Sequence, residues 1–175
     1  MSEKKKAILE TAERLFDKHG FHAVGMKQII EEADVALMTV YNHFQSKEHL
    51  IVEVLKRREE RYMASLKRHM KNSSSIAVAL ATAHMDWLRA NDANGCMFLR
   101  AKEEYSLHPD QSDIIDYADK HKKQLMAFMV EQGLTKQEAI RLVLLFEGAT
   151  ALAEVLDMED VAQELHYSAE RLFEK

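Results

Sequence analysis

Two short apolar patterns separated by a tight turn, within residues 26–47, constrain the fold more than any other part of the sequence. One side of the first pattern is apolar: Ile29, Ile30, Ala33 and Val35. In the second pattern, Val40 and Phe44 are four residues apart and therefore share one face of a short helix. A short helix held by a partner helix across a turn is the helix-turn-helix arrangement, which can enter the DNA major groove. An ordinary helical hairpin is the alternative interpretation.

The composition favours helix along the whole chain. There are only one Pro and five Gly among 175 residues, and no stretch combines strand alternation with turn residues. Helix ends are indicated by Gly20 and by a capping box, Thr135 to Glu138. We therefore predict an all-α chain of nine helices. Two of them lie within 26–43, and the others span about 3–19, 47–70, 76–90, 96–106, 110–132, 135–156 and 158–173.

An ordered set of residues in the first 50 positions is similar to one family. The set comprises Ile8, Leu9, Ala12, Leu15 and Phe16, then His19, Gly20 and Phe21, and above all the run 39–48, Thr-Val-Tyr-Asn-His-Phe-Gln-Ser-Lys-Glu. In order, spacing and residue type it resembles the TetR/AcrR family of bacterial transcription regulators. The rest of the chain resembles that family only in helical character and length.

The resemblance implies a homodimeric repressor with two domains. A helix-turn-helix DNA-binding domain is expected over residues 1–50, and a ligand-binding and dimerisation domain over 51–175. The helix at 47–70 belongs to both and links them mechanically. In such a protein a small-molecule inducer moves the two DNA-binding domains and releases a double-stranded DNA operator. An activator would have the same parts.

Four positions depart from the family pattern. Asp34 replaces the usual turn glycine, and Ala36 replaces the usual serine cap of the second short helix. Asp tolerates a left-handed conformation at modest cost, so the turn is expected to survive. The lost cap costs about 1 kcal/mol unless Asp34 compensates. Leu37 and Met38 replace polar or small residues and can offer only apolar contact.

The outward face of the second short helix and its flanks supply the candidate DNA contacts: Lys27, Leu37, Met38, Thr39, Tyr41, Asn42, His43 and Lys47. Donors at the edge, on Tyr41, His43 and Lys47, are expected to meet phosphates. Thr39 and Asn42 are expected to enter the groove, where Asn can pair with adenine and the Thr methyl can contact thymine. Lys27 is included because relatives use its position for bases or phosphate. The expected site therefore contains A·T pairs. Packing against the neighbouring helix is the alternative for Leu37 and Met38, and it applies more to Leu37 than to Met38.

The net charge of −5 is unevenly divided. Residues 1–71 carry 14 Lys and Arg against 11 Asp and Glu, a net +3. Residues 72–175 carry 10 against 18, a net −8. One end of the chain is thus better suited to phosphates than the other. Lys4, Lys5 and Lys6 are interpreted either as a DNA-binding arm or as a solvated terminus.

Two apolar sets are predicted beyond residue 71. Small and apolar residues at three- and four-residue steps are expected at an isologous four-helix dimer interface: Leu142, Leu145, Ala149, Leu152, Val161, Leu165, Ala169 and Leu172, with Leu156 in the same stripe. Aromatic and thioether side chains are expected to bind an apolar or cationic ligand: His84, Trp87, Leu88, Met97, Phe98, Tyr105, Tyr117, His121, Met126 and Met129, with Phe128 nearby. For each residue alone, burial in the core is the alternative.

No catalytic motif supports an enzyme, and no cofactor or metal is expected. Glu103 and Glu104 are adjacent on a helix and diverge by about 100°, so they do not form a carboxylate pair. A redox or electrophile sensor at Cys96, the single cysteine, is the alternative mode of regulation. A helical adaptor that does not bind DNA is a further alternative. No apolar run is long enough for a membrane span, and a cytoplasmic protein is expected.

Overall fold

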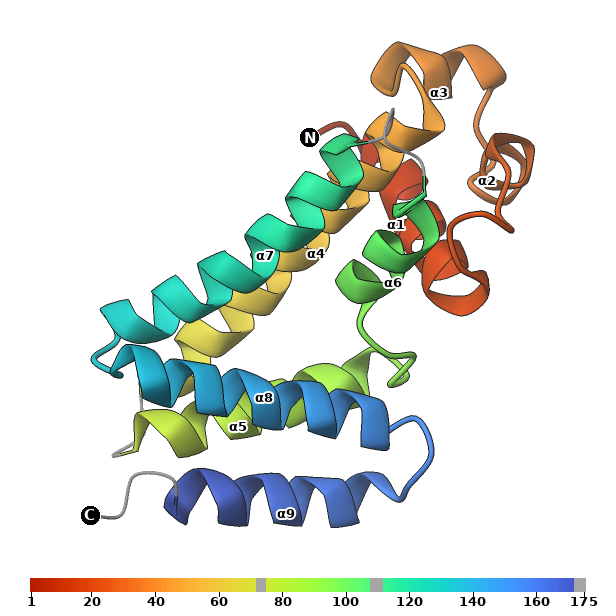
Figure 1. Cartoon of the computed structure of the whole chain (residues 1–175). Coiled ribbons are helices and arrows are strands. Elements are labelled where there is room, and N and C mark those ends of the chain that lie inside the picture. Colours follow the sequence, from red (N-terminus) through yellow and green to blue (C-terminus); the bar gives the residue numbers. More distant parts are fainter. Residues whose placement is uncertain (72–74, 108–111, 172–175) are drawn as a thin grey trace. The chain divides into compact units, whose positions relative to one another are not determined.

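The computed structural model describes residues 1–71, 75–107 and 112–171. Within them the chain forms helices and no strand, as Figure 1 shows. The helices are α1 (Glu3–His19), α2 (Met26–Glu32), α3 (Leu37–His43), α4 (Lys47–Met70), α5 (Ile76–Ala90), α6 (Met97–Tyr105), α7 (Ser112–Glu131), α8 (Lys136–Leu152) and α9 (Met158–Arg171). The all-α, nine-helix prediction is confirmed for these parts of the chain.

Helix ends follow the local signals in the sequence. The backbone N–H of Gly20 bonds to the Phe16 carbonyl at 2.9 Å, and Gly20 takes a φ of +82°. At the start of α8, the Thr135 N–H donates to Glu138 Oε2 at 2.7 Å, and the Glu138 N–H donates back to Thr135 Oγ1 at 3.2 Å. The predicted capping box is therefore confirmed.

Helix α8 ends at Leu152, four residues before the predicted end at 156. The next helix, α9, starts with a side-chain cap. Oδ1 of Asp157 accepts hydrogen bonds from the N–H groups of Glu159 and Asp160, at 2.9 and 3.3 Å. Residues 153–156 form a turn instead.

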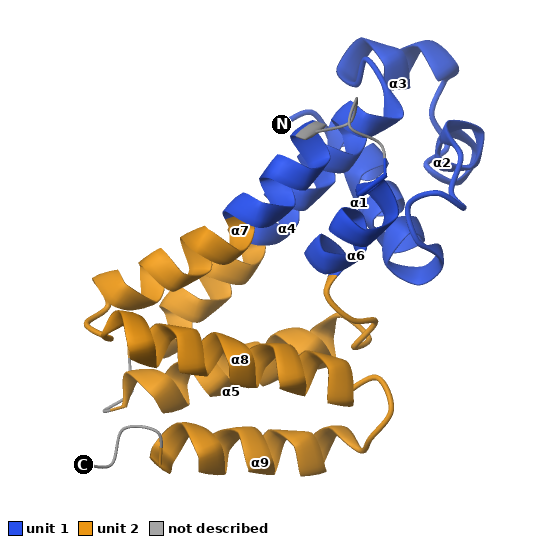
Figure 2. Cartoon of the chain, in the orientation of Figure 1, with its two compact units in different colours: residues 1–59, 97–120 blue, residues 60–96, 121–175 orange. Residues whose placement is uncertain are grey.

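The chain divides into two compact units, coloured separately in Figure 2. The head unit comprises residues 1–59 and 97–120, and the bundle unit comprises 60–96 and 121–175. Helices α4 and α7 each begin in the head unit and end in the bundle unit. Packing therefore groups α6 with the N-terminal helices. The division into a DNA-binding and a ligand-binding domain at residue 50 stays a prediction.

In the head unit α1 and α4 are joined by a buried ion cluster. Nη1 of Arg58 lies 3.0 Å from Glu13 Oε1, and Nη2 lies 3.2 Å from Asp17 Oδ1, with about 7% of the Arg58 side chain exposed. Arg57 reaches Glu10 at 2.6 Å from the same turn of α4. Breaking a buried pair from one side leaves an uncompensated charge, so these contacts fix the register of α1 on α4.

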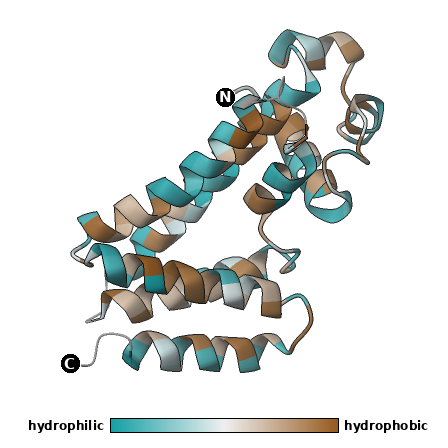
Figure 3. Cartoon of the chain, in the orientation of Figure 1, coloured by the Kyte–Doolittle hydropathy of each residue, from teal (hydrophilic) through white to brown (hydrophobic). Residues whose placement is uncertain are grey.

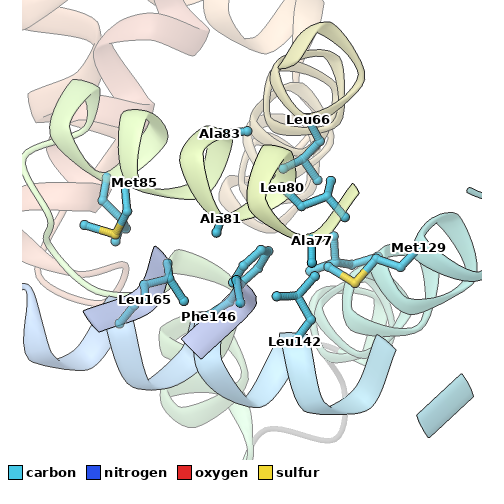
Figure 4. Close-up of a cluster of buried hydrophobic side chains, with 14 of the residues drawn as sticks. Leu66, Ala77, Leu80, Ala81, Ala83, Met85, Met129, Leu142, Phe146 and Leu165 are labelled. Carbon is cyan, nitrogen blue, oxygen red and sulfur yellow. The ribbon is translucent and has the colours of Figure 1, made fainter. Parts of the chain in front are cut away.

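The bundle unit has its own apolar core, formed by α5, α8 and α9 with the second halves of α4 and α7. Figure 4 shows Leu142 and Phe146 of α8 reaching toward Ala77, Leu80 and Ala81 of α5. Small alanines on α5 leave room for the larger side chains of α8, which allows the helices to interdigitate.

Candidate DNA-binding surface and dimer groove

The helix-turn-helix segment is held by the two residues predicted to face inward. Val40 and Phe44 are fully buried, so the inward face of α3 is confirmed. On the other side, Leu37, Met38 and Tyr41 are 55%, 66% and 45% exposed. Asn42 is also exposed, while Thr39 and His43 are half-buried. The structure thus brings six of the eight predicted DNA contacts onto one short helix.

Leu37 was predicted to contact DNA, with packing against the neighbouring helix as the alternative. Its exposure, at the first position of α3, argues against packing. With Met38 it forms an exposed apolar pair on a helix that otherwise carries polar outward groups.

The turn between α2 and α3 keeps its geometry without the usual glycine. Asp34 takes a φ of +50°, the left-handed conformation predicted for it. Ala36 is the extended N-cap residue of α3 and provides no side-chain cap, and no other side chain caps this end. Asp34 therefore does not compensate for the missing serine. Backbone bonds alone begin the helix, with the Thr39 N–H 2.8 Å from the Ala36 carbonyl oxygen.

The lysine side chains around α3 differ in how strongly burial and ion pairs restrain them. Lys47 is half-buried at the start of α4, and burial lowers its pKa, although Glu48 and Glu104 oppose the shift. Ser46 caps α4 by accepting the His49 N–H at 3.1 Å. Lys27 is highly exposed and lies 3.7 Å from Glu31, a pair too solvated to hold it firmly. Lys5 lies 3.2 Å from Glu53 and over the Phe44 ring, so it packs on the head unit.

An apolar groove of about 260 Å³ runs between α8 and α9. It is lined by Leu144, Leu145, Gly148, Ala149, Leu152, Leu156, Asp160, Val161, Glu164, Leu165 and Ser168. Five of the predicted interface residues are among them. Leu142 and Ala169 are instead fully buried in the bundle core, and Leu172 lies outside the described residues. Figure 3 shows hydrophobic residues along α8.

Leu144 was missed by the sequence analysis, although it is 66% exposed at the groove. A signal was present, because Ile140, Leu144, Gly148 and Leu152 recur every four residues and so share one face of α8. Leu152 and Leu156 are also about half exposed. In a single chain Leu144, Leu152 and Leu156 are therefore in contact with water at the groove between α8 and α9.

Comparison with known proteins supports the helix-turn-helix interpretation. The family model described as bacterial regulatory proteins of the tetR family matches residues 8–54. The transcriptional repressor KstR of Rhodococcus jostii (strain RHA1) is 46% identical over 59 residues, which are 34% of this chain and 28% of that protein. The regulator RutR of Escherichia coli (strain K12) is 36% identical over 77 residues, 44% of this chain and 36% of that protein.

A solved structure extends the likeness beyond the N-terminal part. SCO4454, a TetR-family regulator from Streptomyces coelicolor, superposes with a TM-score of 0.84 at 28% identity, covering 98% of this chain and 88% of that one. Residues 8–54 therefore match the tetR family, and the chain has the fold of a TetR-family regulator. Escherichia coli NemR in its reduced form has the same fold, with a TM-score of 0.79 at 20% identity over 97% of both chains. The curated relatives are matched over only about a third of their own lengths.

In this chain the predicted ligand residues fall into both units. Met97, Phe98, Tyr105 and Tyr117 belong to the head unit, and His84, Trp87, Leu88, His121, Met126 and Met129 to the bundle unit. Within the bundle unit the Tyr62 ring lies close to three of them. Its ring centroid lies 6.0 Å from His84, 5.3 Å from Trp87 and 6.2 Å from His121. Tyr62 was absent from the predicted ligand set, because in the sequence it belongs only to the apolar side of a long helix.

Several of these ligand candidates are plain core residues in the structure. Leu88, Met97, Phe98 and Met129 are buried. Tyr105 is buried against Phe21 and His22, and burial raises its pKa to about 12. Tyr117 donates to Glu59 Oε2 at 2.6 Å. Trp87 and Met126 keep partial exposure and are better placed for an incoming molecule. The ligand set as a whole stays a prediction.

Cys96 is half-buried and is contacted by a lysine. Nζ of Lys122 lies 3.5 Å from Cys96 Sγ and also forms an ion pair with Glu147. Burial lowers the pKa of Lys122, but Cys96 and Glu147 together raise it above its ordinary value. The nitrogens of His84 bond to Tyr62, Phe146 and Thr150.

No described helix combines the length and apolar character needed to cross a membrane.

Proposed function

We propose that the chain is a DNA-binding transcriptional regulator, a homodimeric repressor released from a palindromic operator by a small apolar or cationic molecule. The observation that carries this proposal is α3, anchored by buried Val40 and Phe44 and exposing Met38, Tyr41 and Asn42. A helix with one buried and one exposed face on a helical support has the form that enters a major groove. The matches of residues 8–54 to the family support the same role.

Base recognition on this surface combines few hydrogen bonds with apolar contacts. Asn42 has the amide needed for bidentate pairing with adenine, and Thr39 supplies a methyl group for thymine. Leu37 and Met38 are exposed and have no polar atom for a base edge beyond a weakly accepting thioether. An operator rich in A·T pairs, whose thymine methyls meet these side chains, fits the surface. Tyr41, His43 and Lys47 fit phosphate contacts that position the helix.

The test is selection of bound fragments from randomised double-stranded DNA with purified protein, at a fixed salt concentration. A palindromic motif containing A·T pairs is the expected result. The Asn42→Ala variant should then lose preference at one position of each half-site, while His19→Gln, at the exposed end of α1, should not. Weak binding that disappears at moderate salt without a motif would indicate phosphate attraction only and overturn the proposal. That result would favour the helical adaptor.

Dimerisation through the α8–α9 groove is part of the proposal. The groove leaves Leu144, Leu152 and Leu156 in water in a single chain, and Gly148 lets a second helix approach closely. Two copies related by a two-fold axis would cover the same residues on each other. A palindromic operator requires this two-fold symmetry.

The inducer is proposed to bind in the bundle unit near Tyr62 and Trp87. The Arg61 guanidinium lies 5.6 Å from the Trp87 ring centroid, so this ring already faces one cation. An apolar or aromatic ligand fits better here than a second cation. Such a ligand releases the operator only if it binds the released state more tightly than the DNA-bound state. Titration of candidate ligands into the protein–operator complex measures that difference.

Sensing through Cys96 is a second candidate, favoured by the contact with Lys122. The Lys122 ammonium group lies 3.5 Å from the sulfur, and thiols react with oxidants and electrophiles as thiolates. A thiol sensor would release operator after treatment with an electrophile and would lose this response in Cys96→Ser. A ligand-controlled repressor would keep its ligand response in the same variant.

A further inference from the structure

The last turn of α6 holds the segment that follows α1. Both carboxylate oxygens of Glu104 accept backbone N–H groups, Oε1 from Phe21 at 3.0 Å and Oε2 from His22 at 2.7 Å. Hydrogen bonds to an ionised acceptor are about twice as strong as those between neutral groups. A single side chain of α6 thus satisfies two consecutive amides of the α1–α2 connection.

Two further contacts act on the same place. The imidazole Nε2 of His22 lies 2.7 Å from the Glu104 carbonyl oxygen, and its ring centroid lies 4.6 Å from that of Tyr105, with the two planes tilted by 44°. One turn earlier in α6, Arg100 Nη1 donates to the Asp17 carbonyl at 2.7 Å and is 3.4 Å from that of Phe16. A cation at these last carbonyls stabilises the end of α1. Arg100 therefore binds carbonyl groups at the end of α1, and Glu104 binds the amides that follow it.

Gly20 has no side chain and therefore leaves space for the Glu104 carboxylate. Its φ of +82° is unfavourable for a side chain, and an added Cβ would lie 2.8 Å from Glu104 Oε1. The glycine that ends α1 thus also allows the close approach of Glu104. The contact depends on the backbone conformation of the turn as well as on the side chain.

Neither helix of the DNA-binding motif has a side-chain cap of its own. Gly25 and Ala36 are the N-cap residues of α2 and α3, and neither provides a side-chain hydrogen bond. The orientation of α2 on α1 must therefore be fixed by apolar packing and by the turn that connects them. Glu104 and Arg100 are the groups of α6 that hold this turn.

We propose that Glu104 and Arg100 of α6 are positioning residues for operator recognition, holding the α1–α2 turn in the conformation that places α2 and α3 for base reading. This proposal rests on the proposed function. It assigns to α6 a direct effect on DNA affinity through backbone hydrogen bonds, without any contact between α6 and DNA. Loss of the Glu104 and Arg100 contacts would weaken sequence-specific DNA binding. It would leave the attraction to phosphates unchanged, because the surface charges of α3 and its flanks remain.

The test compares Glu104→Gln with Glu103→Gln, which removes the same charge from the exposed neighbouring position. Affinities for the selected operator and for a scrambled duplex are measured by fluorescence anisotropy at one salt concentration. Hydrogen exchange of the Phe21 and His22 amides reports the contact itself. We expect Glu104→Gln to lose about fivefold or more in operator affinity, with scrambled-DNA affinity within about twofold, and faster exchange at both amides. Glu103→Gln should match the wild type.

The outcomes separate the two proposals. Unchanged operator affinity in Glu104→Gln would overturn the positioning role. An equal loss for operator and scrambled DNA would also overturn it, because that pattern indicates general destabilisation. If Glu104→Gln does not fold, Arg100→Gln decides by the same two affinities, with Lys102→Gln as its control. A wild-type protein without sequence preference would overturn the proposed function itself.

Discussion

The hydroxyl group of Tyr62 on α4 lies 2.9 Å from Nδ1 of His84 on α5. On the other side of the ring, Nε2 is 3.2 Å from the Phe146 carbonyl oxygen and 3.1 Å from Thr150 Oγ1. A carbonyl oxygen can only accept, so Nε2 carries the proton and Nδ1 accepts from Tyr62. The ring also stacks on Phe146 at 4.3 Å. His84 is thereby a neutral, fully bonded crosslink between α4, α5 and α8.

This crosslink predicts acid-sensitive stability. Burial lowers the pKa of His84 to about 3 from 6.5. Between these values the unfolded chain binds a proton that the folded chain does not, so the stabilisation is complete above pH 6.5 and falls as the pH drops toward 3. At pH 5 the loss from this group is about 2 kcal/mol. Urea unfolding at pH 7.5 and 5 should show it.

Other groups also titrate over that range, so the comparison requires variants. His84→Gln should be less stable than the wild type at pH 7.5, and its stability should depend less on pH by the same amount. His19→Gln, which removes an exposed imidazole, should keep the wild-type dependence. Equal pH dependence in the wild type and His84→Gln would contradict the assignment.

The missing cap of α3 predicts a stabilising substitution. Ala36 has the extended φ and ψ of an N-cap residue, −66° and 143°, but no side-chain acceptor. Serine at this position can accept the Thr39 N–H, and Ala36→Ser should raise the free energy of unfolding by about 0.5 to 1 kcal/mol. Thermal unfolding of the purified protein measures the change. Ala36→Val, which adds bulk without an acceptor, should give no increase, and equal stabilisation by both would refute the capping explanation.

Local signals explain how much of this structure the sequence could predict. Gly20, the Thr135–Glu138 box and the spacing of Val40 and Phe44 each act within a few residues, so helix ends and the buried face of α3 follow from the sequence. For Leu37 the sequence left two interpretations, because a leucine at the start of a short helix can pack on a neighbour or remain exposed. Its exposure in the structure distinguishes between them.

Long-range contacts had no comparable signal. Glu104 is 83 residues from Phe21 along the chain, and Lys122 is 26 residues from Cys96. A carboxylate on an amphipathic helix is ordinarily solvated, so nothing at Glu104 indicates that it binds two amides. Tyr62 likewise lies on a helix whose pattern shows an apolar side but not which rings will meet there. These partners are decided by packing between helices.

The exposed leucines of α8 predict a change in assembly. Leu144→Glu places a charge in the apolar groove, where a second copy would have to bury it without a partner. We expect the variant to sediment as a monomer at concentrations where the wild type is a dimer. Val130→Glu adds the same charge at an exposed apolar residue of α7 and should stay dimeric. A dimeric Leu144→Glu protein would place the interface elsewhere.

The ion pair beside Cys96 predicts opposite effects of two neutral substitutions. Lys122 lies against the sulfur, while Glu147 neutralises the same ammonium group from its other side. Lys122→Met removes the cation beside the sulfur, and alkylation of Cys96 by iodoacetamide should slow by about threefold. Glu147→Gln leaves that cation uncompensated, so the same reaction should accelerate. The thiol-alkylation rate at pH 7.5 measures both, with the unfolded protein as reference. If both variants change the rate in one direction, altered access to the sulfur is the cause, and electrostatic control of Cys96 by Lys122 is refuted.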